Sequence, residues 1–135
     1  MATPEAEARK TIDRLLEQAG WQVQDYKALN LTAGLGVAVR EVPLSTGAVD
    51  YMLFVDGRAA GVLEAKAVGA TLMGVTTQSE KYQAGTHPAL QNTWGSPLPF
   101  AYESTGVESQ FRDERDPEPR SRLVFGFHKP ETLKD

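Results

Sequence analysis

Apolar positions near the start of the chain recur at helical spacing. They are Ala8, Ile12, Leu15, Leu16 and Ala19. These residues fall on one face of a helix with 3.6 residues per turn. Thr3 is suited to cap the N-terminus, Pro4 to the first helical position, and Gly20 to the stop. The pattern therefore predicts an amphipathic helix over residues 4–18.

After this helix the pattern changes to short β-branched runs separated by turn residues. We expect strands over residues 21–23, 37–44, 49–55, 59–66, 100–105, 108–113 and 123–128. A second helix is predicted over residues 74–84, before Gly85. This order predicts an α/β protein, bordering on α+β, with a mixed central sheet flanked by helices.

The composition of the chain excludes several kinds of site and several classes of protein. With 135 residues the chain is long enough for one domain with a real core, and the absence of cysteine excludes disulfides and thiolate metal sites. No apolar run approaches the ~20 residues that cross a membrane, and the acidic N-terminus does not resemble a signal peptide, so we expect a cytoplasmic protein. The net charge of −4 argues against a free-standing nucleic-acid binder but not against a nuclease.

Charged residues stand at the matched ends of the hairpin predicted over residues 49–66. Asp50 opens its first strand, and Glu64 and Lys66 close the second. Glu64 and Lys66 share a face, because side chains alternate along a strand. Asp50 joins them only if the turn has three residues or the hairpin is bulged; a plain two-residue Asp-Gly turn puts it on the other face. We therefore predict such a turn or bulge, with a positive φ at Gly57.

Two carboxylates and an ammonium on one face are suited to metal-dependent phosphodiester cleavage. Mg²⁺ takes one or two carboxylates together with phosphate oxygens, and it activates a bound water. In this scheme Asp50 and Glu64 hold the metal, and Lys66 orients or deprotonates the water. The alternative is a solvated face with a weak surface ion pair. The apolar residues that surround the acids favour the first interpretation, since they predict a sheet covered on both sides.

Four blocks of the sequence resemble one family in the order in which that family has them. They are EAEARKTIDRLLEQAGW, VREVPL, VDYMLFVDGRAAGVLEAK and TTQSEKYQAG. Together they resemble the N-terminal nuclease domain of the endonuclease (R) subunit of type I restriction enzymes, in the PD-(D/E)xK nuclease superfamily. The resemblance covers nearly the whole chain. Val49 stands where the signature has its loosest residue, proline.

The resemblance implies a restriction-endonuclease-like fold with a four-stranded mixed core sheet and helices on both sides. It implies Mg²⁺-dependent DNA cleavage by Asp50, Glu64 and Lys66. Gln78 and Tyr82 match the family's QxxxY motif, which implies contact with DNA or support of the site; ordinary helix amphipathicity is the alternative. Glu5 matches a first-helix acid that such nucleases aim at the metal, although its place in the first turn also fits a helix-dipole role.

The same resemblance predicts the domain organisation and the partners. Residues 1–127 are expected to form the nuclease domain, and residues 128–135 the start of a linker to a translocase region. ATP would act only through that downstream region, because the chain has no phosphate-binding GxxxxGK[ST] loop. The expected partners are DNA and the modification and specificity subunits. The competing hypotheses are a non-catalytic subunit-docking domain that retains the nuclease fold, and a nuclease of another PD-(D/E)xK branch.

Overall fold

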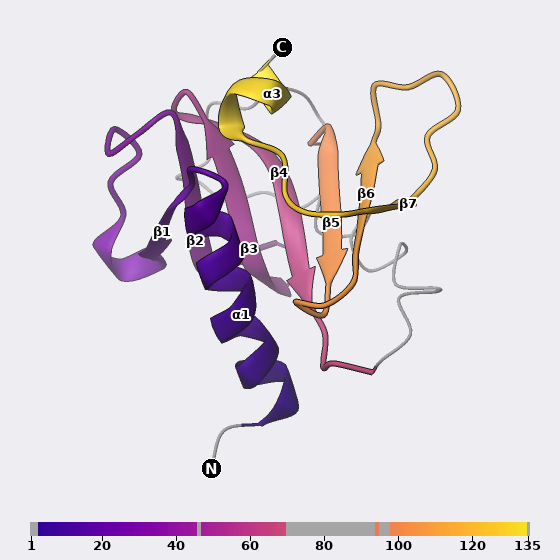
Figure 1. Cartoon of the computed structure of the whole chain (residues 1–135). Coiled ribbons are helices and arrows are strands. Elements are labelled where there is room, and N and C mark those ends of the chain that lie inside the picture. The colour runs from indigo at the N-terminus through magenta and orange to yellow at the C-terminus, as the bar shows by residue number, and fades with distance from the viewer. Residues whose placement is uncertain (1–2, 46, 70–93, 95–97, 135) are drawn as a thin grey trace.

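Seven strands form one sheet in the computed structural model, which describes residues 3–45, 47–69, 94 and 98–134 (Figure 1). The strands are β1 (Gln22–Asp25), β2 (Gly36–Leu44), β3 (Gly47–Val55), β4 (Arg58–Ala65), β5 (Phe100–Ser104), β6 (Ser109–Asp113) and β7 (Arg122–Val124). The helical elements described are α1 (Pro4–Gln18), η1 (Tyr26–Ala28) and α3 (Pro130–Lys134).

The strands lie in the sheet in the order in which they occur in the chain. β1 pairs with β2 and β4 with β5 in parallel, whereas the other neighbouring strands are antiparallel. The predicted mixed sheet is therefore confirmed, and it extends the expected four-stranded core to seven strands. The helix predicted over residues 74–84 lies outside the described residues.

Helix α1 has the predicted bounds. The Thr3 hydroxyl accepts a hydrogen bond from the Ala6 N–H at 3.1 Å, which satisfies one of the unpaired donors at the N-terminus. At the other end Gly20 takes a φ of 99°, a conformation that favours glycine. The helix buries Ile12 and Leu16 completely, so its apolar face and both ends are as the sequence pattern predicts.

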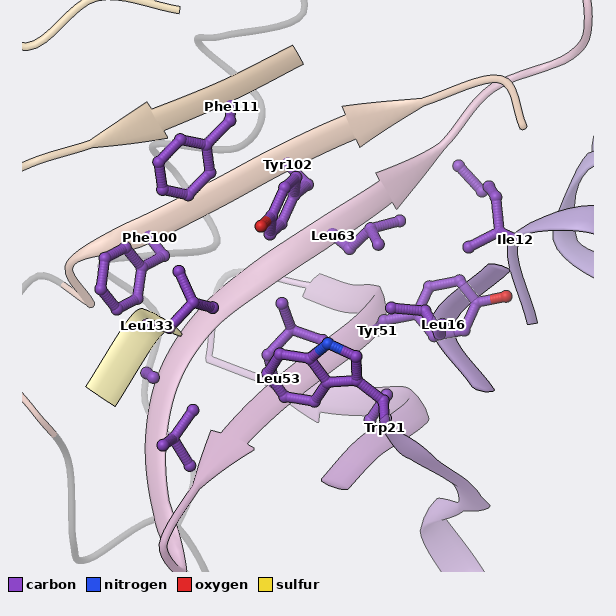
Figure 2. Packing of buried hydrophobic residues seen from close by; sticks show 14 residues of the cluster. Ile12, Leu16, Trp21, Tyr51, Leu53, Leu63, Phe100, Tyr102, Phe111 and Leu133 are labelled. Atoms are coloured by element: carbon purple, nitrogen blue, oxygen red, sulfur yellow. The ribbon is translucent and has the colours of Figure 1, made fainter. Parts of the chain in front are cut away.

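The sheet separates two apolar clusters. Leu53 and Leu63 belong to the cluster on the α1 side, and their neighbours Met52 and Val62 belong to the cluster on the opposite side. Figure 2 shows the first cluster, with the α1 side chains toward one end and Phe100 and Phe111 toward the other. Strands β3 and β4 are buried on both faces over residues 51–55 and 59–63, which explains why these stretches are apolar at successive positions.

The end of the chain packs against the sheet. The strand predicted over residues 123–128 is shorter than expected: β7 ends at Val124, and the chain then crosses the α1 side of the sheet to α3 (Figure 1). The Trp21 indole N–H donates to the His128 carbonyl at 2.9 Å, and Leu133 is 5% exposed in the first cluster. Helix α3 was not predicted, and within residues 128–134, predicted as the start of a linker, it buries Pro130 and Leu133. A translocase region downstream stays a prediction.

No helix in the part of the chain that the structure describes is long and apolar enough to span a membrane.

Candidate active site

The turn between β3 and β4 contains two residues. Val55 pairs with Arg58, which leaves Asp56 and Gly57 as the loop. Their φ angles are 53° and 77°, and two successive positive values are those of a type I′ turn. The positive φ at Gly57 is confirmed. The three-residue turn is not formed, because Asp56, an aspartate, tolerates the left-handed conformation that a two-residue loop needs.

A bulge in β4 supplies the change of register instead. Phe54 lies opposite Ala59, whereas the preceding residue, Leu53, lies opposite Gly61. Ala60 is therefore an extra residue on β4. A Cβ on Gly61 would lie 2.5 Å from the Phe100 carbonyl oxygen, so glycine allows β5 to approach at the bulge. The predicted bulge is confirmed, three residues beyond the turn.

The bulge brings Asp50 and Glu64 together. Tyr51 lies opposite Leu63, and the next residues along the two strands are the two acids. The Asp50 N–H donates to Oε1 of Glu64 at 3.4 Å, and Oδ2 of Asp50 accepts from the Ala65 N–H at 2.9 Å. Glu64 is 3% exposed. The structure thus places both predicted carboxylates at one end of the hairpin.

The environment of Glu64 disfavours a second negative charge. Burial, followed by the charge of Asp50 and a hydrogen bond with its side chain, raises the pKa of Glu64 to about 8. The charge of Lys66 opposes this shift. Near neutral pH the pair therefore retains a proton, and an added cation would relieve the repulsion between the carboxylates.

Lys66 follows the last residue of β4 directly. Its backbone N–H donates to the Ser104 carbonyl at 2.9 Å, which ties this position to the end of β5. The side chain is half-buried. The charge of Lys66 lowers the pKa of Glu64, against the larger effects of burial and Asp50, and a catalytic role for Lys66 stays a prediction.

The structure does not bring the remaining predicted residues to this pair. Glu5 is exposed in the first turn of α1. No group of three acidic or histidine residues that could hold a metal ion occurs within the described ranges, so Glu5 does not complete a three-carboxylate site there. Gln78 and Tyr82 lie outside the described residues.

Two charged residues near the pair were not predicted. Nη2 of Arg9 forms an ion pair with Oδ1 of Asp50, and Nη1 donates to Oε1 of Glu41 at 3.2 Å. Glu103, 0% exposed on β5, lies opposite Glu64 in the parallel pairing. Helix α1 and strand β5 approach the hairpin only in the folded chain, so no local sequence signal marks either residue.

Comparisons with known proteins identify the family and the fold of the chain. The family model described as "Type I restriction enzyme EcoKI endonuclease subunit second domain" matches residues 22–135. The type I restriction enzyme EcoKI endonuclease subunit of Escherichia coli (strain K12) is 27% identical in an alignment that covers 96% of this chain and 15% of that protein. The chain therefore spans only a small part of this relative.

A solved structure, described as a fragment of an HsdR subunit of a type I restriction enzyme from Vibrio vulnificus YJ016, has a similar fold. The TM-score is 0.67 at 16% identity, over 98% of this chain and 25% of that one. This likeness concerns the fold, whereas the family model covers most of the sequence. The chain belongs to the family of the second domain of the type I restriction enzyme EcoKI endonuclease subunit.

Proposed function

We propose that this chain is the Mg²⁺-dependent nuclease domain of the endonuclease subunit of a type I restriction enzyme, and that it hydrolyses DNA phosphodiester bonds. The observation that carries the proposal is the pair of Asp50 and Glu64 on neighbouring strands, with Lys66 directly after the end of β4. The name of the matched relative, an endonuclease subunit, supports the same activity.

The donor set fits a hard divalent cation. Both side chains offer carboxylate oxygens, the ligands that Mg²⁺ prefers, and Mg²⁺ commonly takes one or two carboxylates together with substrate phosphate oxygens and water. Within the described ranges no third acid joins the two carboxylates in a metal-binding group, which leaves positions for such ligands. Burial and the charge of Asp50 raise the pKa of Glu64, and a cation bound by both carboxylates would oppose this shift.

When bound, the ion would polarise the phosphodiester and lower the pKa of an attacking water. The chain's own residues supply the positioning. Asp50 is fixed by the Ala65 N–H, and Glu64 is fixed by burial between β3 and β5. Lys66 would donate to a phosphate oxygen or orient the water, which offsets negative charge as it develops.

The assembled enzyme would supply the other functions. The chain carries a net charge of −4, which opposes binding to DNA phosphates on its own. Recognition would come from the modification and specificity subunits, and ATP would act through regions outside this chain. In this proposal the domain contributes cleavage only.

The test is a DNA cleavage assay with the full-length subunit assembled with its partners. Asp50→Asn, Glu64→Gln and Lys66→Ala should each reduce double-strand cleavage by at least about a hundredfold while ATP hydrolysis is retained. Lys10→Ala, at a side chain that is 70% exposed on α1, is the matched control for loss of a lysine. Undiminished cleavage by any of the three site variants would contradict the proposal.

A further inference from the structure

The Asp50 carboxylate is engaged at both oxygens. Oδ2 accepts the Ala65 N–H, and Oδ1 faces the Arg9 guanidinium. Asp50 is 11% exposed at its side chain, whereas Arg9 is 34% exposed. A guanidinium therefore occupies one side of a carboxylate to which the proposed function assigns a divalent cation.

The backbone of Arg9 is held firmly although its side chain is accessible. The Tyr51 hydroxyl lies 3.1 Å from the Arg9 carbonyl oxygen and 2.6 Å from Oδ1 of Asp13. These contacts attach α1 to β3 at Tyr51, the residue next to Asp50. Arg9 thus has a fixed backbone position and a long side chain that can change its rotamer.

The contacts of the guanidinium are divided between two acids. Nη2 contacts Asp50 and Nη1 contacts Glu41, while the buried Nε has no hydrogen-bond partner within the described residues. A guanidinium bound best to one carboxylate makes two parallel hydrogen bonds to it. Arg9 therefore does not use its full donor set on Asp50. Its departure from Asp50 breaks fewer hydrogen bonds than the departure of a guanidinium bound through two parallel bonds.

Open space lies beside the guanidinium. A cavity of about 310 Å³ is lined by Ala6, Arg9, Lys10, Asp13, Asp25, Arg40 and Glu41. Asp13 and Asp25 are paired with Arg40, so Glu41 is the acid in this cavity that is open to Arg9. Glu41 takes a φ of 54°, a conformation that costs a non-glycine residue free energy and is associated with functional sites. The Glu41 side chain is 70% exposed and offers an anion at which Arg9 remains after it leaves Asp50.

We propose that Arg9 is the placeholder cation of the metal-free site: it neutralises Asp50 until a divalent cation binds, and it is then displaced toward Glu41. Arg9 is a positioning residue in this scheme, and the inference rests on the proposed metal site. Its presence lowers the affinity for the metal, because two cations at one carboxylate repel each other.

The test is a calorimetric titration of the chain with Mg²⁺ and with Mn²⁺. Arg9→Gln should bind the metal about tenfold more tightly or better, and Arg9→Lys, which keeps the charge, should stay within about threefold of the wild type. Arg14→Gln removes the same charge from an exposed position on the same helix and should leave the affinity unchanged. Equal or weaker binding by Arg9→Gln overturns the inference.

The outcomes separate the two claims. If the wild type binds metal and Arg9→Gln binds it equally, only the placeholder role fails; if no variant binds metal, the metal site fails as well. A second measurement needs no variant: the side-chain NMR signals of Arg9 in the wild type should shift when Mg²⁺ saturates the site. Unchanged Arg9 signals at saturation would overturn the inference even if Arg9→Gln does not fold.

Discussion

Replacing Glu64 by glutamine should change how the stability of the chain depends on pH. The pKa of Glu64 is raised to about 8 from an ordinary value of 4.5. Below the ordinary value the side chain is protonated in both the folded and the unfolded state. Between the two values the unfolded chain has released the proton and the folded chain retains it. The free energy of unfolding therefore falls as pH rises through this window, and the fall levels off above about pH 8.

The size of this effect follows from the two pKa values. One pKa unit corresponds to about 1.4 kcal/mol, and integration of the proton linkage between pH 5 and pH 9 gives a fall of about 4 kcal/mol. Such a loss is a large fraction of the 5–15 kcal/mol typical of a domain. Glu64→Gln cannot titrate, so its advantage over the wild type should grow by about this amount across the window.

The assay is urea unfolding at several pH values, followed by tryptophan fluorescence. Trp21 is 2% exposed and reports the loss of the core. Glu17→Gln, at an exposed position on α1, is the control and should give a pH profile parallel to that of the wild type. A profile of Glu64→Gln that stays within 1 kcal/mol of parallel to the wild type, about a quarter of the expected change, would refute the description of Glu64 as a buried, repelled carboxyl.

Two further variants test the packing around the site. Gly61→Ala should lower the free energy of unfolding by about 1–3 kcal/mol, because its Cβ would lie 2.5 Å from the Phe100 carbonyl oxygen. Gly126→Ala, which meets no atom within 4 Å, should have no such cost, and equal urea midpoints for the two variants would contradict this account. Tyr102→Phe should lower the free energy of unfolding by about 1–2 kcal/mol, because the Tyr102 hydroxyl hydrogen-bonds the ring and the backbone N–H of His128. An unchanged urea midpoint would show that these hydrogen bonds do not stabilise the fold.

Local signals predicted most of the fold. Helix α1 could be bounded correctly because Thr3, Pro4 and Gly20 each act within a few residues of themselves. The strands of the hairpin were marked by continuous apolar runs. Helix α3 was missed because its five residues are too few to show a helical spacing of apolar positions. The helix also depends on the burial of Leu133 by distant parts of the chain.

The site was predictable only in part. The charge pattern required a register shift between Asp50 and Glu64, but the place of the shift depends on contact between β4 and β5. Gly61 permits that contact, and the rules of turn geometry do not predict contact with a strand as distant in sequence as β5. Arg9 reaches Asp50 across 41 positions of sequence, so its role could be inferred only from the folded chain.

A divalent cation shared by Asp50 and Glu64 is central to the proposed function. The measurement that tests this is the anomalous difference density of a crystal of the chain soaked with Mn²⁺. We expect one peak within coordination distance of an oxygen of each carboxylate, with the Arg9 guanidinium displaced toward Glu41. Density without a peak between these two carboxylates in a saturating soak would contradict the proposed site.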